Sequence, residues 1–129
     1  AHMKWLRRDI HTLFCCYALC LSEDDFLKEV RKLGMKNHSE WVNKGGGARV
    51  HHFTQKIGPD MAIVCLTQPP GIHKSQVLSM IVHEAAHIFQ WHCDDIGEAS
   101  PSKEFQAYAM QHITQELFRS YEEQTKKKK

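Results

Sequence analysis

The segment from Gln76 to His92 constrains the fold more than any other part of this sequence. Its apolar residues recur on two adjoining flanks of a helical projection, which predicts a helix buried inside the protein. These residues are Val77, Leu78, Ile81, Val82, Ala85, Ile88 and Phe89. The remaining stripe is polar, and its members are His83, Glu84, His87 and Gln90. Because buried polar groups are costly unless something satisfies them, the stripe predicts a functional site.

The polar stripe contains the motif His83-Glu84-Ala85-Ala86-His87, of the form H-E-x-x-H. Residues four apart on a helix are rotated by about 40° and separated by about 6 Å along the axis, so both imidazoles can point at one ion. Glu84 lies between them in projection and can reach a water on that ion without being a ligand. This donor set is typical of a zinc hydrolase. The alternative is a pair of partly buried histidines that donate to carbonyl groups.

A catalytic zinc usually takes a third protein ligand. Glu104 lies 17 residues after His87, in the first turn of a predicted C-terminal helix, and an antiparallel return would bring it opposite the histidines. Residues 92–95 are poorer candidates, because they are turned away from the His83 and His87 stripe or lie too close to the end of the same helix to fold back towards it. Glu98, in the connecting loop, is the rival; we favour Glu104 because ligands on rigid elements are better preorganised. Glu104 could instead be a first-turn acid that stabilises the helix dipole.

The order of the other segments predicts an α+β fold in which a small mixed sheet packs on the histidine-bearing helix and the helix that follows it. We expect one domain over residues 4–125, with a cloning remnant at 1–3 and a basic tail at 126–129. The predicted strands are Phe14–Leu21, for which a short helix is the alternative, Ala48–Thr54 and Met61–Leu66. The predicted helices begin after Ser22, at Ser75 and at Ser100-Pro101. Gly34 is expected to end the first helix, and Gly58-Pro59-Asp60 to form a turn.

The charge balance and the lengths of the apolar runs argue against some kinds of binding partner. The chain has 17 basic and 15 acidic residues, and removing the four lysines of the tail leaves 13 basic residues against the same 15 acidic ones. Such a body argues against a nucleic-acid partner, which needs basic residues clustered on a folded face. No apolar run approaches the roughly 18 residues of a membrane span. The five cysteines form no CxxC pair, and most lie in apolar stretches, which favours buried thiols and a cytoplasmic location.

The stretch HEAAHIFQWHCDDIGEASPSKEFQAYAMQHI resembles the active-site half of the gluzincin-type zinc metallopeptidases. In those families a third-ligand glutamate follows H-E-x-x-H, often in an E-x-x-A pattern, and Glu104-Phe105-Gln106-Ala107 matches that pattern. The resemblance is strongest over Ser75–Tyr121. It is closest to small phage- or prophage-encoded metallopeptidases with a minimal zincin-like fold, for which the host cytoplasm would be the location.

This resemblance implies a Zn²⁺ cofactor held by His83, His87 and Glu104, with Glu84 as catalytic base and a peptide or protein as substrate. The sequence departs from the family four residues after the ligand glutamate, where several gluzincins have Asp or Asn and this chain has Tyr108. The Tyr108 phenol could donate to a ligand or to an oxyanion, or it could be a core aromatic residue. A catalytically silent, zinc-stabilised binding module, for instance a phage factor that acts on a host protein, is the alternative function, and a metal-free helical interaction domain is a third.

Other residues have weaker claims to the site. His51 and His52 point to opposite faces of their predicted strand, so at most one can face a cleft. His112 could support a ligand or lie at the surface, and Trp91 could be part of the core or of a cleft wall. An edge strand near the active-site helix, with Met61–Leu66 as the candidate, could align an extended peptide. The sequence indicates neither the cleavage specificity nor the oligomeric state.

Overall fold

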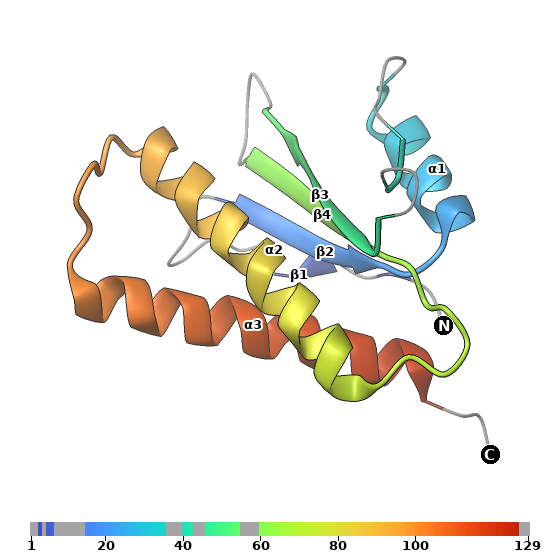
Figure 1. Cartoon of the computed structure of the whole chain (residues 1–129). Helices are drawn as coiled ribbons and strands as arrows, with labels where there is room; N and C mark the ends of the chain where they lie inside the picture. The colour runs from blue at the N-terminus through green and yellow to red at the C-terminus, as the bar shows by residue number, and fades with distance from the viewer. Residues whose placement is uncertain are drawn as a thin grey trace.

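The computed structural model describes residues 3, 5–6, 15–35, 40–42, 46–54 and 60–126. These residues form three helices and a four-stranded mixed sheet with the strand order β1-β2-β4-β3 (Figure 1). The elements are β1 Trp5–Leu6, β2 Cys15–Cys20, α1 Glu23–Lys32, β3 Ala48–Phe53, β4 Asp60–Leu66, α2 Lys74–Asp95 and α3 Lys103–Thr125. The parallel pair is β2 and β4, whereas β1 and β3 are antiparallel to their neighbours. The predicted α+β class with a small mixed sheet is therefore confirmed.

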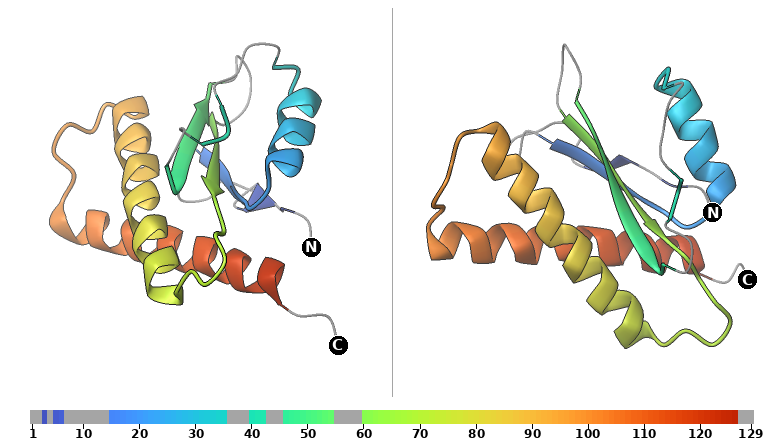
Figure 2. Two further views of the ribbon diagram at one scale, coloured as in Figure 1. Left: turned by 45° about the vertical axis from the view of Figure 1, so that its right-hand side comes forward. Right: turned by 45° about the horizontal axis from the view of Figure 1, so that its top comes forward.

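The sheet lies between two helical layers, with α2 and α3 on one face and α1 on the other (Figure 2). Strand alternation divides the buried side chains between these layers. The larger core contains Tyr17, Leu19, Ala62, Val64, Leu66, Val77, Ile81, Ala85, Ile88, Phe89, Cys93, Ile113, Leu117 and Tyr121. The smaller core, under α1, contains Cys20, Phe26, Val30, Phe53, Ile63 and Cys65. The thiols of Cys16, Cys20 and Cys65 are buried, as the apolar stretches predicted.

Both ends of α1 follow the sequence signals. The Ser22 hydroxyl accepts a hydrogen bond from the Asp25 backbone N–H at 3.2 Å, which caps the first turn. Gly34 adopts a left-handed conformation with φ of 73°, and the Met35 backbone N–H reaches back to the Val30 carbonyl at 3.0 Å. This arrangement satisfies carbonyl groups at the helix end, and glycine adopts it without steric cost.

The order of the strands corrects one prediction about peptide binding. Met61–Leu66 lies within β4, which is paired on both sides, by β2 and by β3. Its backbone groups are therefore already used within the sheet and cannot receive an added strand. Among the described strands it is β3, Ala48–Phe53, that forms the edge of the sheet next to α2. Of the turn predicted at Gly58-Pro59-Asp60, the first two residues lie outside the described part, and Asp60 begins β4.

The long helix α2 differs from the prediction at both ends and along one flank. Its N-cap is His73 and not Ser75, because the His73 side chain accepts from the Ser75 backbone N–H at 3.2 Å and the Gln76 side chain accepts from the His73 N–H at 3.0 Å. The helix continues to Asp95. Leu78 and Val82 are 38% and 42% exposed, so only one of the two apolar flanks is fully buried.

The last helix also begins later than predicted. Ser102, not Ser100, is the N-cap of α3, since its hydroxyl accepts from the Phe105 backbone N–H at 3.1 Å, and Pro101 precedes the helix. Polar contacts join α3 to β2: the Tyr17 hydroxyl donates to Glu116 at 2.9 Å, and the Gln124 amide donates to the Leu19 carbonyl at 2.9 Å. Within the described residues no helix is both long and apolar enough to cross a membrane.

Candidate functional site

His83 and His87 lie side by side on α2, one turn apart. Their ring centroids are 5.0 Å apart and the rings meet edge to face. His83 is exposed and His87 is half-buried, so the pair is open to solvent on one side. The helix has therefore brought together the two imidazoles of the motif, as the spacing predicted.

A hydrogen bond orients the second of these rings. His87 Nδ1 lies 3.2 Å from the Gln90 Oε1 atom, which can only accept. In the tautomer protonated at Nδ1, this contact is a hydrogen bond to Gln90, and Nε2 keeps the lone pair that a metal ion would take. Such outer hydrogen bonds fix the tautomer and the orientation of metal-binding histidines.

Glu84 is directed towards the protein interior, and only 6% of the residue is exposed. Burial raises the pKa of its carboxyl group, while the neighbouring charges of His83 and His87 act in the opposite direction. A carboxylate whose pKa is raised by burial is a stronger proton acceptor than one in water. Glu84 thus has the electrostatic character of a general base beside the two imidazoles.

The structure does not bring Glu104 into a group with His83 and His87. The α3 helix approaches α2 through Phe105, whose ring centroid lies 5.5 Å from that of Phe89. Phe89 is two residues after His87, so the two side chains leave the helix about 160° apart. Glu104 is exposed on α3, next to Phe105. Its role as third ligand stays a prediction.

Two other residues with a predicted role in the site, Glu98 and Tyr108, lie on the connecting loop and on α3. Glu98 is exposed in the loop that connects α2 and α3. Tyr108, one turn after Glu104 on the same face of α3, is 66% exposed and is therefore not a core aromatic residue. Any role of its phenol in catalysis stays a prediction.

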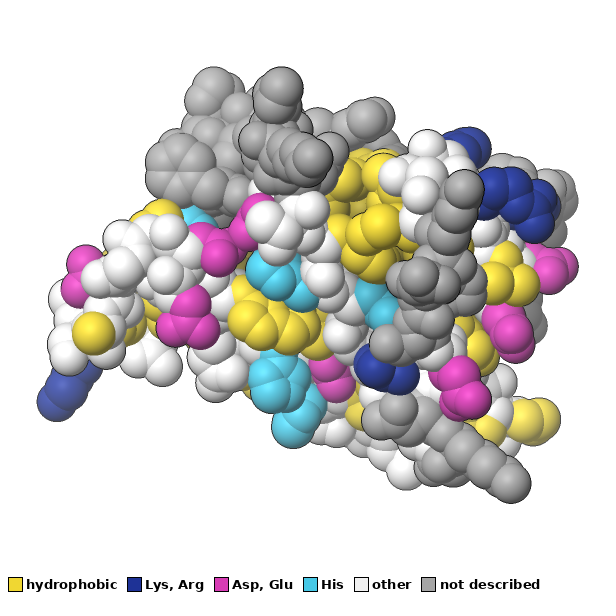
Figure 3. All heavy atoms as spheres, turned by 90° about the horizontal axis from the view of Figure 1, so that it is seen from above, with side chains coloured by type: hydrophobic (Ala, Val, Ile, Leu, Met, Phe, Trp, Pro, Cys, Tyr) yellow, Lys and Arg dark blue, Asp and Glu magenta, His cyan; other side chains and the backbone are white. Residues whose placement is uncertain are grey.

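A row of rings extends from the histidine pair towards the end of α2. Trp91 lies one turn beyond His87, with ring centroids 6.1 Å apart and planes 29° apart. On its other side Trp91 stacks on His52 of β3, with centroids 4.6 Å apart and planes 15° apart. Figure 3 shows histidine side chains and carboxylates gathered around a hydrophobic surface on this face of the molecule. Trp91 is thus part of a wall that joins β3 to α2.

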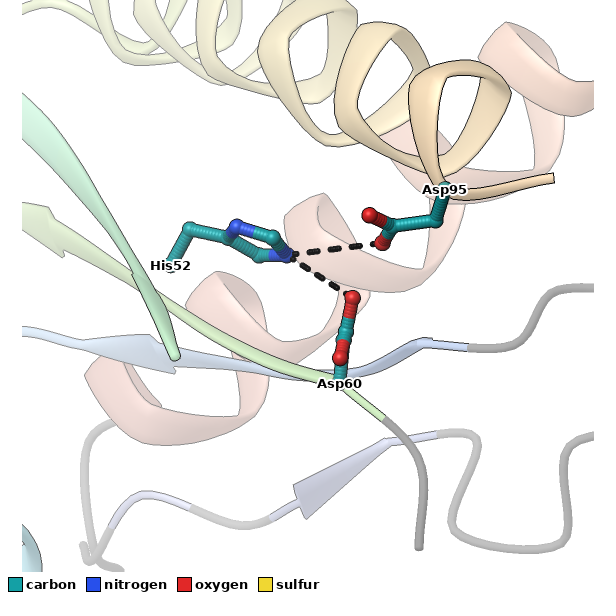
Figure 4. Close-up of side chains that lie close together, drawn as sticks. All are labelled: His52, Asp60 and Asp95. Atoms are coloured by element: carbon teal, nitrogen blue, oxygen red, sulfur yellow. Dashed lines mark ion pairs between the residues drawn. The ribbon is translucent and has the colours of Figure 1, made fainter. Parts of the chain in front are cut away.

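Beyond Trp91, His52 meets two carboxylates (Figure 4). His52 Nε2 lies 3.4 Å from an Asp60 oxygen and 3.8 Å from an Asp95 oxygen. These three side chains come from β3, from the start of β4 and from the last residue of α2. In the described part of the chain they are the one group of three His, Cys, Asp or Glu side chains whose potential ligand atoms all lie within 4.8 Å of one another.

The two carboxyl groups of this cluster contact each other. A hydrogen bond with Asp60 raises the pKa of Asp95, and burial and the charge of Asp60 raise it further, against the effects of His52 and His92. Sharing one proton is the usual way in which two adjacent carboxylates avoid repulsion.

Three other histidines of the described residues, His51, His92 and His112, have structural surroundings. His51 is buried under α1, where its ring lies 4.5 Å from that of Phe26 and its Nε2 atom lies 3.0 Å from the Trp41 carbonyl. It faces away from His52, as the strand alternation predicted. His112 forms an ion pair with Glu116 on α3. His92 is 3% exposed, and burial lowers its pKa.

No sequence motif predicted the cluster of His52, Asp60 and Asp95. One signal was available, because an antiparallel pairing of the two predicted strands sets His52 opposite Ala62. Asp60 then lies two residues earlier on the same face, close to His52 across the strands. The contribution of Asp95 depends on the angle at which α2 crosses the sheet, and no sequence pattern reports that angle.

The chain was compared with known proteins. No family model, no curated protein and no solved structure matches it.

Proposed function

We propose that this protein is a zinc-dependent metallopeptidase, a member of the minimal gluzincin type, whose site lies on α2 around His83, Glu84 and His87. The observation that carries the proposal is the pairing of two adjacent, solvent-facing imidazoles, 5.0 Å apart, with a buried carboxyl group of raised pKa. This combination provides metal ligands and a proton acceptor on one turn of a rigid helix.

The donor set agrees with two of the three protein ligands that a catalytic zinc takes. Imidazole nitrogen is a preferred ligand of zinc, and Gln90 holds His87 in the tautomer that leaves Nε2 for the ion. Glu104 is the third ligand that the family resemblance suggests, and it would have to approach the histidines from α3.

When bound, zinc would supply Lewis acidity, which polarises a peptide carbonyl and acidifies water. Glu84 would accept the proton from the attacking water and pass it to the departing amine nitrogen. Burial favours this role, because the carboxyl group with a raised pKa holds the proton more readily than an exposed one. The substrate would be an extended peptide, and β3 at the edge of the sheet would align it by backbone hydrogen bonds.

The substitution Glu84→Gln tests the proposal. Zinc-loaded wild-type protein should cleave a library of quenched fluorescent peptides, and the variant should lose at least about 100-fold of this activity, the lower range for a general base. The variant should still bind zinc, as measured by elemental analysis after dialysis. A variant with unchanged cleavage would refute the role of Glu84.

The same assays separate the competing functions. A silent zinc-stabilised module would bind zinc and melt on chelation, without cleavage. An interaction domain without metal at the α2 histidines would have the same zinc content in the wild type and in His83→Ala. For the third ligand, Glu104→Ala should lower zinc stoichiometry while Glu98→Ala should not, and the reverse result would exchange their roles.

A further inference from the structure

We propose that His52, Asp60 and Asp95 form a second metal site, which binds a divalent transition-metal cation such as Mn²⁺ or Zn²⁺. The site is separate from the histidine pair of α2 and does not depend on the proposed peptidase activity. Three elements of the fold converge on it, and each contributes one oxygen- or nitrogen-bearing side chain (Figure 4).

The distances between the side-chain atoms of the cluster fit a shared cation. A direct hydrogen bond between nitrogen and oxygen spans about 2.7–3.2 Å. The His52 Nε2 atom lies 3.4 Å from Asp60 and 3.8 Å from Asp95, beyond that range. Two ligands bound at about 2.1 Å to one tetrahedral ion lie about 3.4 Å apart. The two distances from His52 therefore suit ligands of one cation better than a direct hydrogen bond from His52 to either carboxylate.

The His52 ring also has a nitrogen that lacks a hydrogen-bond partner among the described residues. His52 Nε2 is buried and has no hydrogen-bond partner in the part of the chain that the structure describes. Buried polar atoms of this kind are rare, and each one suggests a ligand, a water or an ion. Trp91 stacks on the ring and fixes its plane, so that Nε2 is directed at both carboxylates.

The electrostatic surroundings of the two carboxyl groups also favour a cation. Asp95 is the last residue of α2, and the C-terminal end of a helix carries partial negative charge. A second carboxyl group, Asp60, contacts it there. Two carboxylates at a negative helix end repel each other, and a shared proton, a protonated His52 or a bound cation can relieve the repulsion. A bound cation would stabilise both carboxylates and would also use the lone pair of His52.

The mixture of donors selects the class of cation. Carboxylate oxygen alone suits Mg²⁺ and Ca²⁺, whereas an imidazole ligand favours transition metals. Asp95 has a side chain that is 41% exposed, so water can reach the ion and complete its coordination. We therefore expect Mn²⁺ or Zn²⁺ to bind and Mg²⁺ to bind weakly.

The experiment uses the full chain with both α2 histidines replaced, His83→Ala and His87→Ala, so that the peptidase site cannot bind metal. After chelation and dialysis, Mn²⁺ is titrated and the free ion is followed by electron paramagnetic resonance. One equivalent should bind. Adding Asp95→Asn or His52→Gln to this background should weaken binding by at least about 10-fold, as for loss of a metal-supporting group.

Asp94→Asn is the matched control, because Asp94 is the exposed neighbour of Asp95 and lies outside the cluster. It should change the affinity by less than about twofold. Circular dichroism of each variant checks that the helices are retained, and a rise in melting temperature on adding Mn²⁺ gives a second readout. Absence of Mn²⁺ and Zn²⁺ binding in the double histidine background, or equal effects of Asp94→Asn and Asp95→Asn, would overturn the proposal.

Discussion

The imidazole of His52 lies nearly parallel to the indole of Trp91, with ring centroids 4.6 Å apart and planes 15° apart. The same indole lies 6.1 Å from His87, centroid to centroid. Trp91 therefore stands between the histidine pair of α2 and the cluster of His52 and two aspartates. One side chain supports both candidate sites, and its replacement should affect them differently.

Replacing Trp91 by Ala should weaken Mn²⁺ binding at the His52 cluster. The stack contributes about 0.5–1.5 kcal/mol beyond burial, which corresponds to roughly 2- to 10-fold in affinity if it is needed to hold the ring. Trp91→Phe keeps a stacking surface and should stay within about twofold of the wild-type affinity. Titration of Mn²⁺ in the His83→Ala, His87→Ala background measures the effect. Equal loss in the Ala and Phe variants would show that the stack does not position His52.

Gln90→Ala should weaken zinc binding at the histidine pair. The amide oxygen of Gln90 fixes the tautomer of His87, and loss of such a hydrogen bond typically costs about 10- to 100-fold in metal affinity. Competition with a chromophoric chelator measures this affinity. Gln90→Glu keeps an acceptor at the same place and should retain zinc, so a large loss in this variant would contradict the explanation.

The sequence predicted most of this fold, for a reason visible in the individual elements. Val50, Ile63 and Phe26 lie in short segments, and the alternation or helical spacing of the apolar residues in each segment predicts which side chains are buried. The helix starts were less certain, because several residues near each start can cap. His73 has an imidazole nitrogen that accepts from a backbone N–H, and this role is not apparent from the usual preferences for Ser and Asp.

For α2, the apolar pattern gave a prediction that was wrong in part. Two adjoining apolar flanks predicted burial all along α2, but α3 covers only part of the second flank and leaves Val82 42% exposed. Hydrophobic spacing records which residues can be buried, and the position of the covering helix decides which ones are. The prediction for Glu104 depends on the same factor, because it needs α3 to approach the side of α2 that carries His87, and it stays a prediction.

Ile81 and Val82 allow a measurement of the difference between an apolar residue that is buried and one that the pattern only predicts to be buried. Ile81 is fully buried in the larger core, so Ile81→Ala should lower the free energy of unfolding by about 2–5 kcal/mol. Val82→Ala, at a neighbouring exposed position, should lower it by less than about 1 kcal/mol. Urea denaturation of both variants gives the comparison. Similar losses at the two positions would mean that a further surface covers Val82 in solution.

The cluster of His52, Asp60 and Asp95 could be predicted only in part. Strand pairing relates His52 to Asp60, because the register places both on the α2 face of adjacent strands. Asp95 belongs to the cluster only because α2 extends to this residue and crosses the sheet at the observed angle. Its proximity results from packing between distant segments, for which a single sequence carries no periodic signal.

His92 should make the metal-free protein sensitive to mild acid. Burial lowers the pKa of this imidazole in the folded state, and the nearby Asp95 opposes the shift only in part. Below the ordinary value of 6.5, the unfolded chain therefore binds a proton that the folded chain does not. The free energy of unfolding should consequently fall as the pH decreases from about 6.5 towards the lower folded-state pKa.

The variant His92→Gln removes this titration and should show a smaller fall between pH 7.5 and about pH 5.5, measured by urea denaturation at each pH. Ser79→Ala, at an exposed and uncharged position of the same helix, is the control and should keep the wild-type dependence. If His92→Gln and the wild type lose stability in parallel, the acid sensitivity has another origin. A fall that begins only well below pH 6 in the wild type would point to carboxyl groups, because their unfolded-state pKa values are near 4.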